Sequence, residues 1–150
     1  MSLQTAWILN ALGMPIFDRG QKILTWMFQI TPSGSYVSGG DTLDLGQLFG
    51  TQLVGNSSAI PGMTPGFVSN TPPSSWFVQI QSQPPAAGSS ATGYVYLFKG
   101  GTTLNNCKMQ IFQSAGSTAA LSELPNNTVY SSTSPSIAAD TIVALATVPV

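Results

Sequence analysis

The stretch 22-KILTWMFQI-30 decides the fold class of this 150-residue chain. Its residues form two alternating sets, one large and apolar and the other more polar: Leu24, Trp26, Phe28 and Ile30 against Thr25, Met27 and Gln29. Successive side chains of a β-strand point to opposite faces of the sheet. The alternation therefore predicts a strand that turns one face toward a hydrophobic core.

Similar short runs, rich in Val, Ile, Thr and aromatic residues, recur between the 15 glycines and 11 prolines of the chain. This pattern is typical of sandwiches and barrels. The further expected strands are 35–37, 41–45, 76–81, 94–99, 104–113, 128–131 and 141–148. We predict an all-β, single-domain β-sandwich over residues 18–150, jelly-roll-like and with about 7–9 strands. The helix candidates are residues 3–12 and 118–124.

Two of these strands are apolar on both faces. The run 94-YVYLFK-99 is predicted to be a central strand, followed by a hairpin turn and a return strand with Cys107, Met109 and Ile111 inward. The run 141-TIVALATV-148 also has no polar face. Such a segment needs cover on both sides, from a second sheet, a helix or a neighbouring chain.

Two segments are expected to lie outside the regular sheet. Residues 1–17 form an apolar N-terminal arm, which has no positively charged leader and is too short to span a membrane. Residues 50–75 hold several prolines and form a long irregular loop within the domain. Long loops in compact domains are usually functional or mobile.

The charge of the chain limits its partners. Charged residues make up 6% of the sequence, where about 25% is usual. The basic residues are Arg19, Lys22, Lys99 and Lys108. Nucleic-acid binders and proteins recruited to anionic membranes need clustered cations, so neither partner is predicted. Low charge leaves two interpretations: a neutral, hydrated surface, or a surface covered in an oligomer or on a larger particle.

Residue counts exclude most catalytic and metal sites. The chain has no histidine and one cysteine, so histidine-dependent triads, Cys/His zinc sites and intrachain disulfides are all excluded. No phosphate-binding glycine motif occurs. The closest acidic pair, Asp41 and Asp44, would point to opposite faces of a strand and would converge only around a tight turn at 39-GGD-41. We predict no enzyme activity, no cofactor and no metal.

The segment 39-GGDTLDL-45 is better explained as a turn followed by a core strand. Gly39 and Gly40 suit a turn that needs positive φ. The Asp41 carboxylate is suited to capping that turn. Leu43 and Leu45 are then expected inward, with Thr42 and Asp44 outward.

Three segments resemble small structural proteins encoded in the head modules of tailed bacteriophages. They are 34-GSYVSGGDTLDL-45, the hairpin 94-YVYLFKGGTTLNNCKMQIFQ-113, and the end 119-AALSELPNNTVYSSTSPSIAADTIVALATVPV-150. In that family a segment like GGDTLDL comes early, and an ELP…Y piece and then ADTI precede a final apolar strand. Neither the first 17 residues nor the loop 50–75 belongs to this resemblance.

The resemblance implies a head decoration (cement) or minor capsid protein. Such proteins bind the outer surface of the expanded capsid, often as trimers, and join neighbouring major capsid subunits without catalysis. The expected partners are the major capsid protein and copies of the chain itself, and the expected location is the virion. The arm and the loop would supply the apolar interface residues, namely Trp7, Ile8, Leu9, Leu12, Ile16, Phe17, Ile60, Met63 and Phe67.

A second interpretation is a carbohydrate- or receptor-binding β-sandwich of a phage fibre or adhesin. Sugar-binding modules stack their ligands on exposed Trp or Tyr side chains. Trp26 and Trp76 alternate with other apolar residues and are predicted to be in the core, while Trp7 belongs to the N-terminal segment. Tyr94 and Tyr96 share a strand face with Phe98 and are expected to be half-buried.

Overall fold

The computed structural model describes residues 2–8, 17–20, 23–45, 77–83, 93–102, 106–114 and 120–149. Its strands are β1 (Ser2–Trp7), β2 (Phe17–Gly20), β3 (Ile23–Thr31), β4 (Asp41–Leu43), β5 (Phe77–Gln83), β6 (Tyr94–Lys99), β7 (Cys107–Ser114), β8 (Leu121–Glu123) and β9 (Thr141–Pro149). Two short 3-10 helices, η3 (Tyr130–Ser132) and η4 (Ile137–Ala139), come just before β9.

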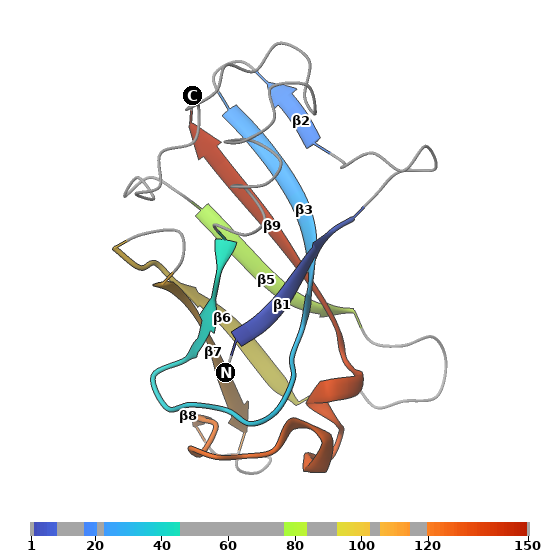
Figure 1. Ribbon diagram of the computed structural model, residues 1–150, viewed down its shortest axis with the longest axis vertical. Helices are drawn as coiled ribbons and strands as arrows, with labels where there is room; N and C mark the ends of the chain where they lie inside the picture. The colour runs from blue at the N-terminus through green and yellow to red at the C-terminus, as the bar shows by residue number, and fades with distance from the viewer. Residues whose placement is uncertain are drawn as a thin grey trace.

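All nine strands belong to one continuous sheet. Its main path has the order β5-β9-β3-β1-β4-β7-β6, while β2 pairs with β3 and β8 pairs with β7. Every pairing is antiparallel except that of β1 with β4. The sheet curls until β5 and β6, at the two ends of the path, lie against each other (Figure 1). The result is nearly a closed barrel.

The prediction of an all-β fold with about seven to nine strands is confirmed. The sheet can be viewed as a sandwich, because its two halves face each other across one core. It differs from two separate sheets in that β1 and β4 join the halves by hydrogen bonds. The N-terminal strand is therefore the link that makes the sheet continuous.

The core lies inside this curled sheet and follows the predicted alternation. Phe28 and Ile30 on β3 are fully buried, as are Cys107, Met109 and Ile111 on β7. Ile142, Ala144 and Ala146 of β9 are also fully buried. Small alanine side chains on β9 leave room for the larger residues of β3, which pair with β9 along its whole length.

The structure corrects the prediction for the N-terminus. Residues 2–7 are not a separate arm, because β1 lies within the sheet between β3 and β4 (Figure 1). The helix candidate at 3–12 is also wrong over these residues. Leu3 is buried while Gln4 and Ala6 are exposed, which is the alternation of a strand. Residues 9–16 lie outside the described part.

Three other local predictions differ from the structure. The helix candidate at 118–124 contains strand β8, and the strand expected at 128–131 is a single bridge, Ser35 to Val129, followed by η3. The strand β6 is not central, because it pairs with β7 alone. Its inner residues face the core, whereas Val95 and Leu97 on its outer side are 39% and 47% exposed.

The turn at 39-GGD-41 has the predicted conformation. Gly39 and Gly40 adopt φ values of 87° and 103°, and the Gly40 N–H donates to the Val37 carbonyl at 3.0 Å. The Asp41 carboxylate accepts the Val37 N–H at 2.8 Å and so caps the turn. Leu43 and Leu45 are fully buried beyond it, and Thr42 and Asp44 are half-buried on the opposite side.

The two turn glycines should respond differently to alanine. A Cβ on Gly39 would meet nothing within 4 Å, whereas a Cβ on Gly40 would lie 3.0–3.1 Å from Gln110 Cγ, Lys108 Cβ and the Met109 carbonyl. We expect Gly39→Ala to lower the free energy of unfolding by about 1 kcal/mol through its backbone conformation. Gly40→Ala should lower the free energy of unfolding by about 2–3 kcal/mol, because crowding of the added Cβ adds to the cost of the backbone conformation. Urea unfolding of both variants measures the difference, and equal losses would contradict this crowding.

Candidate interaction surface

The outer face of the half-sheet β5-β9-β3 is the main candidate for a functional surface. The strand register sets two cross-strand rows on it, Gln79–Leu145–Met27 and Gln81–Val143–Gln29. These residues alternate with the buried residues of the same strands, so they point away from the core. The strand β9 thus turns Val143 and Leu145 to the side opposite the core, where Leu145 is half-buried and Val143 is 6% exposed.

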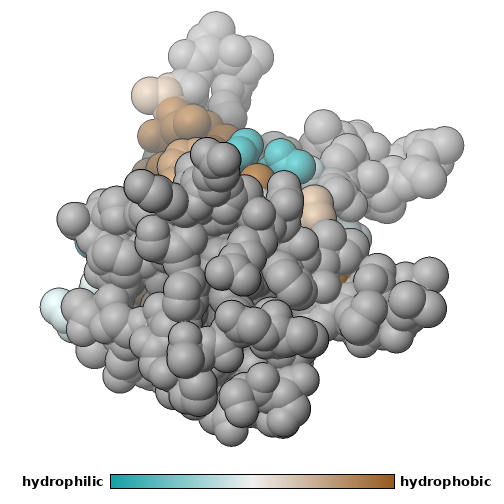
Figure 2. All heavy atoms as spheres, turned by 90° about the horizontal axis from the view of Figure 1, so that it is seen from above, coloured by the Kyte–Doolittle hydropathy of each residue, from teal (hydrophilic) through white to brown (hydrophobic). Residues whose placement is uncertain are grey.

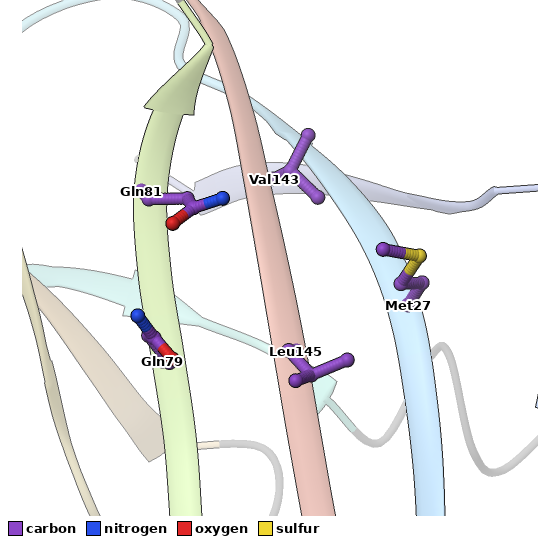
Figure 3. A pocket seen from close by; sticks show the side chains of 5 residues that line it. All are labelled: Met27, Gln79, Gln81, Val143 and Leu145. Carbon is purple, nitrogen blue, oxygen red and sulfur yellow. The ribbon is translucent and has the colours of Figure 1, made fainter. Parts of the chain in front are cut away.

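The rows enclose a shallow groove of about 100 Å³. Figure 3 shows Val143 and Leu145 on β9 at its centre, with the amides of Gln79 and Gln81 on one side and Met27 on the other. The groove therefore has an apolar floor and flexible, uncharged walls. The thioether of Met27 adapts readily to the shape of an apolar ligand or partner.

The outer face of these three strands carries no charge. Its outward-facing residues are Thr25, Met27, Gln29, Thr31, Phe77, Gln79, Gln81, Thr141, Val143, Leu145 and Thr147. Phe77, at one end of β5, is 60% exposed. Figure 2 shows a gathering of hydrophobic residues on the surface of the molecule, with hydrophilic residues beside it. An uncharged surface of this kind can be buried against another protein without leaving a charge unpaired.

The groove lies on a domain held together by buried tyrosine–carboxylate pairs. Asp41 is 1% exposed, and the Tyr130 hydroxyl donates to its second carboxylate oxygen. Burial raises the pKa of Tyr130 well above its usual range, and the hydrogen bond to Asp41 raises it further. The Tyr130 N–H also donates to the Gly34 carbonyl at 3.0 Å. Asp41 thus ties the turn before β4 to the segment before β9.

A second pair joins the same turn to β8. The Tyr36 hydroxyl donates to Glu123 Oε1 at 2.5 Å, and the Gly39 N–H donates to the same oxygen at 2.6 Å. The Tyr36 hydroxyl also accepts the Ile111 N–H at 3.4 Å. These hydrogen bonds hold the pKa of Glu123 below its usual range, with the Tyr36 hydroxyl as the main cause.

The lowered pKa of Glu123 predicts a pH dependence of stability. A carboxyl group whose pKa falls on folding stabilises the folded state above its unfolded pKa, and this stabilisation is lost as the pH falls through the folded pKa. We therefore expect the urea concentration at the unfolding midpoint to decrease as the pH drops below about 4.5, which is the usual pKa of such a group. Glu123→Gln should flatten this part of the pH profile. If the two profiles kept the same shape, Glu123 would not be the titrating group.

A third carboxylate is held in the core at the start of β9. Asp140 is 8% exposed and accepts hydrogen bonds from the Tyr96 hydroxyl at 2.6 Å and from Ser82 Oγ at 2.7 Å. Burial raises the pKa of Tyr96, and Asp140 raises it further. Because Ser82 lies on β5 and Tyr96 on β6, this contact joins the two strands at the ends of the sheet path. Asp140 supports the near-closure of the barrel.

Two of these carboxylates are fully engaged in hydrogen bonds within the fold. Asp41 and Asp140 are buried, and each accepts hydrogen bonds on both oxygens. Among the described residues, no group of three or more His, Cys, Asp or Glu side chains is placed to hold a metal ion. The described part of the chain also contains no helix long and apolar enough to cross a membrane.

The predicted interface residues fall partly outside the description. Leu9, Leu12, Ile16, Ile60, Met63 and Phe67 lie outside the described residues. Trp7 pairs with Phe28 in the ladder of β1 and β3, and Phe17 pairs with Trp26 in that of β2 and β3. Ile8 is half-buried, and its N–H donates to the Met27 carbonyl at 3.3 Å. Trp7, Ile8 and Phe17 therefore belong to the sheet or its immediate continuation.

The groove residues were not among the predicted interface residues. Their signal in the sequence was the strand β9, whose outward positions include the apolar residues Val143 and Leu145. The register that sets Gln79 and Met27 on either side of Leu145 depends on strand pairing, which sequence alternation alone does not provide. Comparison with known proteins returned no matching family model, no matching curated protein and no matching solved structure.

Proposed function

We propose that this protein is a structural component of a tailed-phage virion that binds the outside of the capsid and joins neighbouring major capsid subunits. The observation that carries the proposal is the uncharged outer face of β5, β9 and β3, with its apolar groove around Val143 and Leu145. Burying such a face stabilises a complex by roughly 25 cal/mol for each Å² of apolar area. No chemical step is needed.

Three further observations support an assembly role. The chain has few charges, so a large part of its surface can be covered at little electrostatic cost. Its continuous sheet is braced by hydrogen bonds from three buried tyrosines to carboxylates, which favours a rigid module. The sequence segments that resemble phage head proteins include the GGD turn and the strands β6, β7 and β9. Many copies on one shell would add their weak contacts by avidity.

The alternative of a carbohydrate-binding module has no specific support in the described residues. Tyr36, Tyr96 and Tyr130 are buried, and their hydroxyls are engaged within the fold. Tyr94 is half-buried and packs against the core. The rings of Tyr36, Tyr96 and Tyr130 are therefore not open for stacking a sugar.

The proposed function predicts self-association. Decoration proteins of this kind are often trimers, so the native mass should be three times the 15.6 kDa of one chain. Light scattering after size-exclusion chromatography measures this mass directly. A stable monomer over the whole accessible concentration range would count against the trimer.

The same sample titrated with glycans should show no change in tryptophan fluorescence, and a saturable change would favour the carbohydrate-binding alternative.

A further inference from the structure

Two lysines lie side by side on the outer face of β6 and β7. The register pairs Lys99 directly with Lys108. Both point outward, because Cys107 and Met109 on either side of Lys108 are fully buried. They are two of only four basic residues in the chain. Like charges directly opposite each other in an antiparallel ladder are destabilising, so the sheet itself gains nothing from this arrangement.

The direct side-chain contact that the described residues give this pair is with a neutral group. Lys108 Nζ donates to Thr42 Oγ1 at 3.0 Å, and this oxygen belongs to a neutral hydroxyl. Thr42 pairs with Lys108 across β4 and β7, so the row Lys99–Lys108–Thr42 crosses three strands. Beside this row, Gly40 lies beneath Gln110 and Lys108. Two ammonium groups and a hydroxyl thus belong to one row on this outer face.

Exposed apolar side chains continue along β6 from this surface. Leu97 and Val95 point to the same outer side as Lys99 and are 47% and 39% exposed. Leu97 lies opposite Gln110 and Val95 opposite the half-buried Phe112, so Phe112 is the apolar residue that β7 adds to this strip. The face therefore combines cations at one end with apolar contacts along the strand.

A second copy of this chain has few carboxylates to place on the lysines. Among the acidic side chains that the structure describes, Asp41 and Asp140 are buried, Asp44 is half-buried, and Glu123 Oε1 already accepts two hydrogen bonds. The Lys99 charge is close enough to contribute to the lowered pKa of Glu123, but the Tyr36 hydroxyl is the larger cause. Charge complementarity thus favours a different chain, one that carries accessible carboxylates.

We propose that the outer face of β6 and β7 binds an acidic segment of a partner protein, with carboxylates on Lys99 and Lys108 and apolar side chains on Leu97 and Val95. Where that partner is the capsid subunit, the inference rests on the proposed function and describes the chemistry of one contact. The face is separate from the uncharged groove of β5, β9 and β3, because the two belong to different halves of the sheet.

The test uses a short dye-labelled peptide of alternating Asp and Leu, titrated with the full chain and followed by fluorescence anisotropy. The double variant Lys99→Gln/Lys108→Gln should bind it about tenfold more weakly, since each exposed ion pair contributes up to about 1 kcal/mol. The matched control is Arg19→Gln/Lys22→Gln, which changes the net charge by the same amount and should bind within twofold of the unaltered protein. Leu97→Ser should also weaken binding, by about threefold.

Three outcomes would overturn the inference. They are no saturable binding of the peptide to the unaltered protein, equal weakening by both double variants, or equal binding of a peptide in which Asn replaces Asp. Far-ultraviolet circular dichroism of each variant checks that the fold is retained. Because the titration uses no capsid, failure here with intact capsid binding would contradict the acidic contact alone and leave the proposed function standing.

Discussion

Replacing Asp41 by Ala is expected to lower the free energy of unfolding by about 3–4 kcal/mol. The change removes both oxygens that accept the Val37 N–H and the Tyr130 hydroxyl, and Tyr130 is fully buried. An unsatisfied buried donor costs about 1–3 kcal/mol, and here two donors lose their acceptor together. Urea unfolding followed by circular dichroism measures the loss. A change below about 1 kcal/mol would contradict the structural role of Asp41.

Two milder variants separate the contributions. Asp41→Asn keeps an oxygen for the Val37 N–H and can donate its amide to the Tyr130 oxygen, so we expect a loss of only about 1–2 kcal/mol. Tyr130→Phe removes one hydroxyl and leaves the turn cap in place. The loss of unfolding free energy in Tyr130→Phe should be about as large as that in Asp41→Asn. The expected order is therefore Asp41→Ala as the most damaging change, with the other two close together.

The second large effect concerns the groove rather than the core. Leu145→Arg should weaken capsid binding by at least about 100-fold while leaving the fold intact. Leu145 is half-buried on the outer face of β9, so an arginine there can reach solvent in the isolated protein. In the complex the same charge would be buried without a partner, at a cost of several kcal/mol. Each 1.4 kcal/mol of binding free energy is a factor of ten.

A matched control comes from β8. Leu121 is 54% exposed and lies away from the groove, in the other half of the sheet. Leu121→Arg therefore makes the same chemical change outside the proposed contact and should bind within about threefold of the unaltered protein. Equal losses in both variants would point to a general effect of added charge. If Leu145→Arg bound the capsid as well as the unaltered protein does, the groove would not be part of the contact.

The turn and the core strands could be predicted from local sequence. Gly39 and Gly40 in succession predict positive φ, and Asp41 next to them predicts a cap, because these are properties of adjacent residues. The inward set of Cys107, Met109 and Ile111 follows from the two-residue period of a strand. Local rules of this kind need no knowledge of which strands meet.

The partners of these residues could not be predicted in the same way. Asp41 meets Tyr130, 89 residues later, and Tyr36 meets Glu123, 87 residues later. Such contacts depend on the order of strands in the sheet. The same order explains the two main corrections. Residues 2–7 gain hydrogen bonds from both β3 and β4, and so become a strand rather than an arm. The apolar strand β6 falls at the end of the sheet path, where it pairs with β7 alone and lies against β5.

The candidate surface, too, could be predicted from the sequence only in part. The sequence indicated that strand 141–148 needs cover on both faces, and the structure places the core on one side and the groove on the other. The residues that complete the groove come from β3 and β5, which lie far from β9 in the sequence. The predicted interface at Ile60, Met63 and Phe67 lies outside the described residues and stays a prediction.

The most direct test of the central claim is co-sedimentation with purified expanded capsids, with electron micrographs of the same particles. We predict saturable binding at a fixed number of copies per shell, added density on the outer surface, and loss of both with Leu145→Arg but not with Leu121→Arg. Protein that stays in the supernatant at every concentration, with bare shells in the micrographs, would contradict the account.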